Sequence, residues 1–124
     1  MATIAEFDAL DPVKLVDLDG GRWSVIFSPG GPADLDAEPV FAEYDLEGNG
    51  YDWSGAVEAV LTEGEPHLVE RLRFDPEAGM VSISVGDDDL EALHAAAAAL
   101  HQLLDDHTAL AAALTAAARL ELLD

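Results

Sequence analysis

The residues best suited to chemistry lie in one short acidic segment of this 124-residue chain. Asp45, Glu47 and Asn49 occupy alternate positions before Gly50, as the oxygen ligands and the turning glycine do in an EF-hand calcium loop. That motif also needs a helix before the loop and a bidentate glutamate at its twelfth position, which here is Ala56. The sequence predicts a strand before the loop, so specific calcium binding is not the favoured interpretation.

Histidines could supply metal ligands of another kind. His94 and His101 are seven residues apart on a predicted helix, which places them roughly 10 Å apart along its axis. One ion with bonds of about 2 Å does not bridge that distance. His101 and Asp105 lie one turn apart but form only half a site. We therefore predict no metal site and no cofactor, and we expect these histidines to lie in solvent.

The sequence also lacks the usual arrangements of nucleophilic catalysis. It has no cysteine, and no serine lies in a Gly-x-Ser-x-Gly turn. Gly48 and Gly50 precede a predicted helix, as in a phosphate-binding loop, but no lysine follows and Glu47 and Asp52 would repel an anion. We predict no catalytic residues and a protein that is not an enzyme.

Net charge is the strongest signal in the composition. Asp and Glu number 26 against five Lys and Arg, a formal net charge of −21, while half of the residues are hydrophobic. A folded domain with this charge repels nucleic acid and anionic membranes and associates faster with a basic partner. The acids could equally serve solubility alone. Since the chain shows no signal peptide, no membrane span and no cysteine, a cytoplasmic location is expected.

Strand patterns occur mainly in two predicted hairpins. In the first, Asp19-Gly20-Gly21 joins two β-type runs, and in the second a turn rich in Pro and Gly joins two more. A fifth strand is predicted immediately before the acidic segment. The predicted strands are Val13–Leu18, Arg22–Phe27, Val40–Leu46, Arg73–Asp75 and Met80–Val85.

Helical patterns fill the rest of the chain. Ser54–Leu61 is predicted as a helix capped by Asp52 or Ser54, and Pro66–Leu72 as a short helix. Asp87-Asp88-Asp89 precedes a leucine-patterned helix to about Leu104, and Asp105-Asp106 precedes a final helix to about Leu120. We predict one α+β domain over residues 1–124, with an antiparallel sheet of about five strands built from hairpins. It packs against two long C-terminal helices, with one or two short helices between.

The segment Glu47–Trp53 (EGNGYDW) is the most distinctive part of the chain. Its glycines permit a sharply turned backbone, and Tyr51 and Trp53 could either anchor the loop on the core or contact a partner. The segment is followed by a helix, by LRFDPEAGMVSISV (Leu72–Val85) and by an acid-capped leucine helix. In these features the chain resembles immunity-protein family fifty-one of bacterial polymorphic toxin systems, over roughly Val40–Leu104.

The resemblance implies a small cytoplasmic α+β protein that is encoded beside a secreted toxin and neutralises it by binding, without catalysis. Together with the charge, it predicts an acidic surface that occludes a basic substrate-binding face of the toxin. Nucleic acid and membranes are not expected as partners, and the oligomeric state stays open. Alternatives are a stand-alone acidic module that binds a small ligand or calcium through Asp45–Asp52, and a DNA-mimicking regulator. The candidate partner-binding residues are Glu47, Asn49, Tyr51, Asp52 and Trp53.

Overall fold

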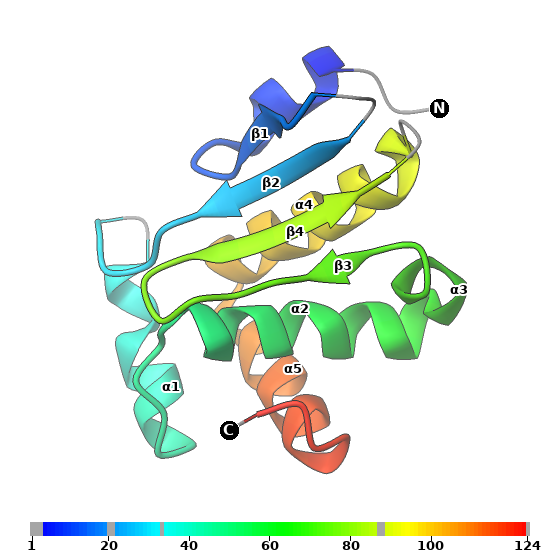
Figure 1. Ribbon diagram of the computed structural model, residues 1–124. Coiled ribbons are helices and arrows are strands. Elements are labelled where there is room, and N and C mark those ends of the chain that lie inside the picture. Colours follow the sequence, from blue (N-terminus) through cyan, green and yellow to red (C-terminus); the bar gives the residue numbers. More distant parts are fainter. Residues whose placement is uncertain (1–3, 20–21, 33, 87–88, 124) are drawn as a thin grey trace.

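The computed structural model describes residues 4–19, 22–32, 34–86 and 89–123. Its centre is a four-stranded antiparallel sheet in the order β1-β2-β4-β3 (Figure 1). The strands are β1 (Lys14–Asp17), β2 (Trp23–Phe27), β3 (Arg73–Phe74) and β4 (Val81–Val85). Both predicted hairpins are therefore present, and β2 pairs with β4 to join them. The Gly20-Gly21 turn lies outside the described residues.

Alternation along β4 separates the two faces of the sheet. Val81, Ile83 and Val85 are buried, whereas Ser82 and Ser84 are only half-buried. Val25 lies opposite Ile83 in the register and is buried on the same inner face, because residues paired across strands project to the same side. Helix α4 (Leu90–Asp105) runs behind this inner face (Figure 1).

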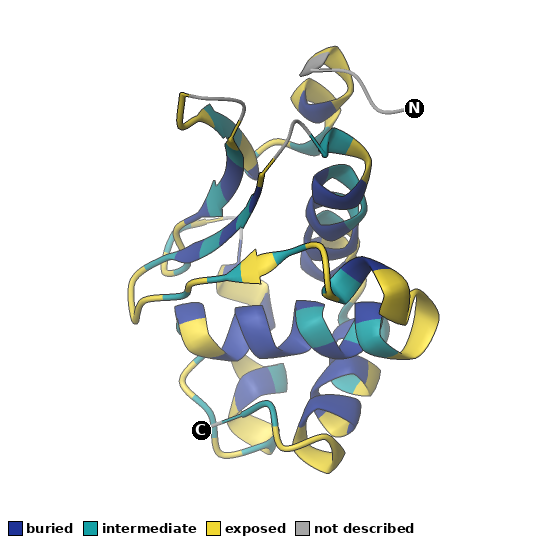
Figure 2. Ribbon diagram, turned by 45° about the vertical axis from the view of Figure 1, so that its right-hand side comes forward, coloured by how far each residue is buried: buried dark blue, intermediate teal, exposed yellow. Residues whose placement is uncertain are grey.

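The remaining helices complete the layer beneath the sheet. Helix α2 (Gly50–Gly64) runs along the β3 edge, and α5 (His107–Arg119) packs against α2 (Figure 1). Buried positions line the facing sides of α2, α4 and α5 (Figure 2). No described helix has the length and apolar character needed to cross a membrane. The short elements are η1 (Ile4–Leu10), η2 (Leu35–Ala37), α1 (Glu38–Glu43) and α3 (Pro66–Val69).

Small residues let α2 and α5 approach each other closely. Ala59 of α2 is buried against Ala116 and Ala117 of α5, where a larger side chain would hold the helices apart. Gly55 serves the same purpose at the chain end, because a Cβ there would lie 2.7 Å from the backbone oxygen of Leu122. The alanine-rich composition of the C-terminal helices is thus a packing requirement as well as a helix propensity.

The predicted strand Val40–Leu46 is wrong, because this segment contains most of α1. An alternating strand would place Val40, Ala42 and Tyr44 on one face, yet Ala42 is exposed while its neighbour Phe41 is only 1% exposed. Ala37 and Phe41, four residues apart, are the buried pair, which is a helical spacing. The sheet therefore has four strands rather than about five, and the α+β class with two long C-terminal helices is confirmed.

Helix boundaries also differ in detail from the prediction. Helix α2 begins at Gly50 and its N-cap is Asn49, rather than Asp52 or Ser54. Helix α3 ends at Val69, before the predicted Leu72. Asp89 and Asp106 cap α4 and α5 as expected, through backbone N–H groups of Ala92 and Ala109. Asp87 and Asp88 lie outside the described residues.

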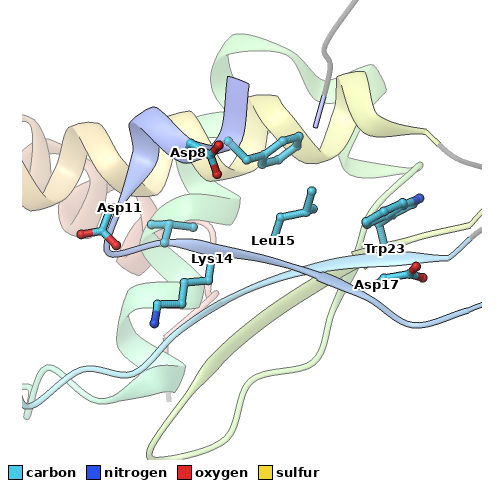
Figure 3. Close-up of a pocket in the computed structure, with 8 residues that line it drawn as sticks. Asp8, Asp11, Lys14, Leu15, Asp17 and Trp23 are labelled. Carbon is cyan, nitrogen blue, oxygen red and sulfur yellow. The ribbon is translucent and has the colours of Figure 1, made fainter. Parts of the chain in front are cut away.

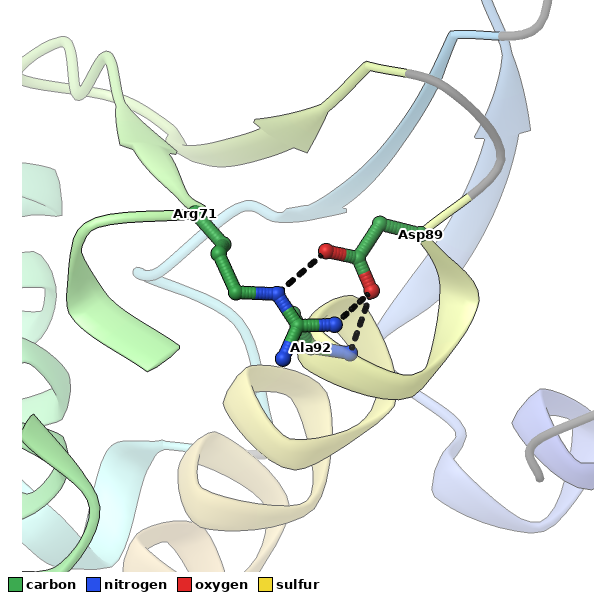
Figure 4. A network of polar contacts seen from close by, with 3 residues as sticks. All are labelled: Arg71, Asp89 and Ala92. Carbon is green, nitrogen blue, oxygen red and sulfur yellow. Dashed lines mark hydrogen bonds and ion pairs between the residues drawn. The ribbon is translucent and has the colours of Figure 1, made fainter. Parts of the chain in front are cut away.

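Asp89 links the start of α4 to the segment that follows α3. Its carboxylate accepts hydrogen bonds from Nε and Nη2 of Arg71, at 2.6 and 2.5 Å, and from the backbone N–H of Ala92 at 3.4 Å (Figure 4). The hydrogen bond from Arg71 is the main reason that the pKa of Asp89 lies below its usual range, and the same bond raises the pKa of Arg71. One carboxylate therefore serves both as a helix cap and as an ion-pair partner.

Replacing Asp89 separates these two roles. We expect Asp89→Ala to lower the free energy of unfolding by about 1–2 kcal/mol at pH 7, since it removes both the cap and a partly exposed ion pair. Asp89→Asn keeps a capping oxygen and should cost less. Because the pKa of Asp89 is lowered in the folded state, its charge stabilises the protein above the ordinary carboxyl value. That contribution disappears as pH falls through the lowered pKa.

Urea unfolding of these variants at several pH values measures both effects. Asp106 provides the matched control, because it caps α5 with a 3.0 Å hydrogen bond from Ala109 and forms no ion pair among the described residues. Asp106→Asn should therefore resemble the parent more closely than Asp89→Asn does. Equal costs for Asp89→Asn and Asp89→Ala would show that the capping hydrogen bond contributes nothing.

Candidate functional site

The distinctive segment Glu47–Trp53 forms the tightly bonded start of α2. The side chain of Asn49 accepts a 3.0 Å hydrogen bond from the backbone N–H of Asp52. The Asp52 carboxylate in turn accepts from the N–H groups of Gly48 and Asn49, at 2.9 and 3.2 Å. This reciprocal capping box satisfies donors that a helix start otherwise leaves unpaired. Gly48 has a φ of +76°, which explains the glycine before the cap.

Gly50 fixes the loop against the turn between β3 and β4. Its N–H donates to the backbone oxygen of Ala78 at 2.9 Å. A Cβ at Gly50 would lie 1.9 Å from the oxygen of Glu77 and 2.5 Å from that of Met80. Backbone atoms cannot be displaced as a flexible side chain can, so only glycine fits here. The start of α2 and the second hairpin are thus in direct backbone contact.

Trp53 carries the anchoring energy of this segment. It is fully buried, and its indole ring meets Phe27 and Phe41 edge to face at centroid distances of 5.9 and 4.9 Å. These contacts join α2 to both β2 and α1. Its Nε1 is buried without a hydrogen-bond partner among the described residues. The indole therefore serves packing, and burial of its N–H group reduces the net gain.

The five candidate partner-binding residues fall into two groups. Glu47 and Tyr51 are exposed, Tyr51 to 42%, and Asn49 is half-buried. Asp52 is 4% exposed and Trp53 is fully buried, so both lie beneath the loop surface. The structure therefore brings Glu47, Asn49 and Tyr51 to the surface and uses Asp52 and Trp53 to hold them there.

The loop oxygens are used internally. A helix, α1, does precede the loop, but the side-chain oxygen of Asn49 already caps α2, and Asp52 is bonded to two backbone N–H groups. Among the residues that the structure describes, no group of three or more His, Asp or Glu side chains is gathered as a metal ion requires. His94 packs edge to face on Phe7, with ring centroids 5.2 Å apart, and His101 lies 3.9 Å from Asp105.

A second surface feature was not predicted from sequence. A cavity of about 470 Å³ opens between η1 and the β1–β2 edge of the sheet (Figure 3). Leu15 and Trp23 project into it from the inner face of the sheet, where Leu15 pairs with Val25 and Trp23 with Asp17. Lys14 points away on the opposite side of β1. The lining residues are Phe7, Asp8, Asp11, Val13, Lys14, Leu15, Asp17 and Trp23.

The cavity combines an apolar floor with a carboxylate rim. Phe7 and Val13 are buried, whereas Asp8, Asp11 and Asp17 are exposed. The aliphatic stem of a lysine or arginine side chain suits such a floor, and its charged head suits the rim. The three aspartates come from η1, the link to β1, and β1 itself, so no local motif marks them. The only sequence signal is the period-two spacing that places Trp23 on the same strand face as Val25 and Phe27.

The fold, the Glu47–Trp53 loop and the cavity beside β1 define a small acidic α+β protein with two surface features suited to binding. A family model described as Immunity protein 51 matches residues 33–119. The chain therefore belongs to this family, and the predicted resemblance is confirmed. No curated protein and no solved structure matches the chain. The match includes the Glu47–Trp53 loop, but all eight residues that line the cavity precede it.

Gly50 allows a direct test of the loop geometry. We expect Gly50→Ala to destabilise the fold by roughly 3 kcal/mol or more, because overlap with fixed backbone exceeds ordinary core overpacking. Gly64→Ala is the matched control at the other end of α2, where a Cβ would meet nothing within 4 Å. It should change the free energy of unfolding by less than about 1 kcal/mol. Urea unfolding followed by circular dichroism measures both. Equal costs for the two variants would contradict the proposed backbone contact.

Proposed function

We propose that this immunity protein binds its cognate toxin domain directly and occludes a basic substrate-binding face, without catalysing a reaction. Family membership implies a toxin partner. The observation that carries the finer proposal is the formal net charge of −21 on a folded α+β domain. A toxin domain that acts on nucleic acid carries positive charge in order to hold phosphate. Opposite charges on the two proteins speed their encounter and select the correct partner.

The Glu47–Trp53 loop supplies one part of the proposed contact surface. Tyr51 and Glu47, four residues apart in this loop, are both exposed. The loop backbone is held by the capping box and by the hydrogen bond from Gly50 to Ala78, so little conformational freedom remains to be lost on binding. A rigidly held tyrosine is a common anchor in protein interfaces. Asp52 and Trp53 contribute by positioning it.

The cavity beside β1 supplies a second part. One of the lining aspartates, Asp8, Asp11 or Asp17, would receive a lysine or arginine head group from the toxin, while the apolar lining contacts its aliphatic stem. A site of this kind adds a specific side-chain contact to the long-range electrostatic attraction between the two proteins. We place the whole interaction in the cytoplasm, where the toxin would otherwise act on the producing cell or its neighbours.

Co-expression provides the primary test of the immunity role. The toxin domain encoded beside this gene should stop growth when expressed alone and permit growth when this chain is present. The two chains should then co-purify in fixed stoichiometry. Growth arrest that persists with soluble, folded immunity protein present would overturn the proposal. Conversion of the toxin substrate or of a metabolite by this chain alone would overturn its non-catalytic part.

The cavity aspartates should control the association rate. We expect the combined variant Asp8→Asn, Asp11→Asn and Asp17→Asn to slow association about 10-fold at low salt, since steering depends on charge near the contact. The difference should shrink in high salt, where screening shortens the reach of charge. Stopped-flow fluorescence measures both rates. The control is Asp36→Asn, Asp75→Asn and Asp105→Asn, which changes net charge equally at exposed sites elsewhere. Equal slowing by both variants would remove the cavity from the interface.

Tyr51 should contribute to the lifetime of the complex. We expect Tyr51→Ala to weaken toxin binding by about 2 kcal/mol, mainly through faster dissociation, and to change stability by less than about 0.5 kcal/mol. Leu35→Ala serves as the control, because Leu35 is a 59% exposed apolar side chain on η2. Biolayer interferometry measures the dissociation rate of the complex for each of the two variants. Unchanged binding by Tyr51→Ala would exclude the loop as an anchor.

A further inference from the structure

The few basic residues of this acidic chain are not spread evenly over it. Three of its five Lys and Arg side chains, Arg22, Arg71 and Arg73, line one pocket of about 320 Å³. Ser84 and Gly86 of the β4 end also line it, and Glu70 is the one acidic residue of the lining within the described part of the chain. The immunity role proposed above does not use this pocket. The pocket and the cavity beside β1 have no lining residue in common.

Strand register explains how the three arginines meet. Arg73 of β3 pairs with Ser84 of β4, and Ser84 pairs with Ser24 of β2. Arg22 precedes Ser24 by two residues, so both project from the same face of the sheet. This is the outer face, opposite to the buried Val85 and Ile83. Residues about 50 positions apart in the sequence are thereby placed around the Ser84 hydroxyl.

The three arginines differ in whether an acidic side chain pairs with their charge. Arg71 is bonded through two nitrogens to Asp89, so its charge is already balanced (Figure 4). Arg22 and Arg73 are exposed and form no ion pair or side-chain hydrogen bond among the described residues. The Ser84 hydroxyl likewise has no partner there. Two like charges on one sheet face repel each other, and an oxyanion placed between them removes that repulsion.

Gly86 lines the pocket without a side chain. It follows Val85 directly, and a Cβ built on it would meet nothing within 4 Å. The pocket therefore offers two guanidinium groups that have no ion-pair partner among the described residues, one hydroxyl donor and free space at one end of the sheet. Guanidinium groups bind carboxylate and phosphate through paired N–H donors, which is stronger and more directional than contact with a lysine.

We propose that the pocket formed by Arg22, Arg73 and Ser84, with Arg71 as a fixed wall, is a binding site for a small oxyanion. Its ligand is the carboxylate or phosphate group of a small molecule or of a protein. The negative field of the whole chain opposes the approach of any anion, so binding in the millimolar range is expected rather than tight binding. Arg71 positions the wall of the site rather than binding the anion with its full set of donors.

Arginine side-chain NMR tests the site without a toxin. The Nε–H signals of the ¹⁵N-labelled full chain are followed during titration with inorganic phosphate and, separately, with acetate, at constant ionic strength held by chloride. We expect the Arg22 and Arg73 signals to shift saturably in the millimolar range, while Arg119 does not shift. Arg119 is the internal control, because it lies on α5 and is paired with Glu63. Saturable binding of either anion supports the site, and the tighter anion identifies the group that it takes.

Variants separate a built site from general charge. Arg73→Gln should weaken anion binding at least about 5-fold, because it removes one of two charged donors, whereas Arg119→Gln should leave it unchanged. Gly86→Val adds an apolar side chain to the pocket lining without changing any charge and should abolish the saturable shifts. Circular dichroism confirms that each variant is folded. Shifts that rise linearly with concentration, that appear equally at Arg119, or that persist in Gly86→Val would overturn the proposal.

Discussion

The contact between Gly50 and the β3–β4 turn is the constraint on which the rest of the structure depends. The backbones of the loop and the hairpin approach so closely that a single added carbon would overlap with two carbonyl oxygens. This contact sets where α2 begins, and the capping box then sets its direction. Trp53, one turn into the helix, is thereby directed between Phe27 and Phe41. Sheet, α1 and α2 are joined at this one place.

Packing and recognition are divided between neighbouring residues of the same segment. Trp53 faces inward and stabilises the fold, whereas Tyr51, two positions earlier, faces solvent. A helix separates residues two apart by about 200°, so one face can be buried while the other is presented. The same division occurs at the sheet, where Val85 is buried and Ser84 lines the arginine pocket. Surface chemistry can therefore change at Tyr51 or Ser84 without disturbing the core.

Local patterns predicted much of this fold and less of its site. The hairpins, the alternation of β4 and the caps Asp89 and Asp106 were all readable, because each depends on a few adjacent residues. The segment Val40–Leu46 was misassigned because three of its seven residues suit a strand by propensity, and burial of Phe41 with Ala37 decided for a helix. The need for glycine at position 50 and the meeting of Arg22 with Arg73 arise from long-range pairing. Single-sequence reasoning does not reach such contacts.

The two edges of the sheet have a consequence for how any complex is built. Strand β3 has only two residues and α2 runs beside it, while β1 has four residues, with a lysine and an aspartate at its ends. A sheet edge that is short, charged or covered offers few free backbone N–H and C=O groups. A strand of another protein therefore cannot readily extend the sheet. Fibril-like self-stacking is disfavoured for the same reason. In the proposed complex, discrimination between related toxins would then depend on side chains, and point substitutions could alter it.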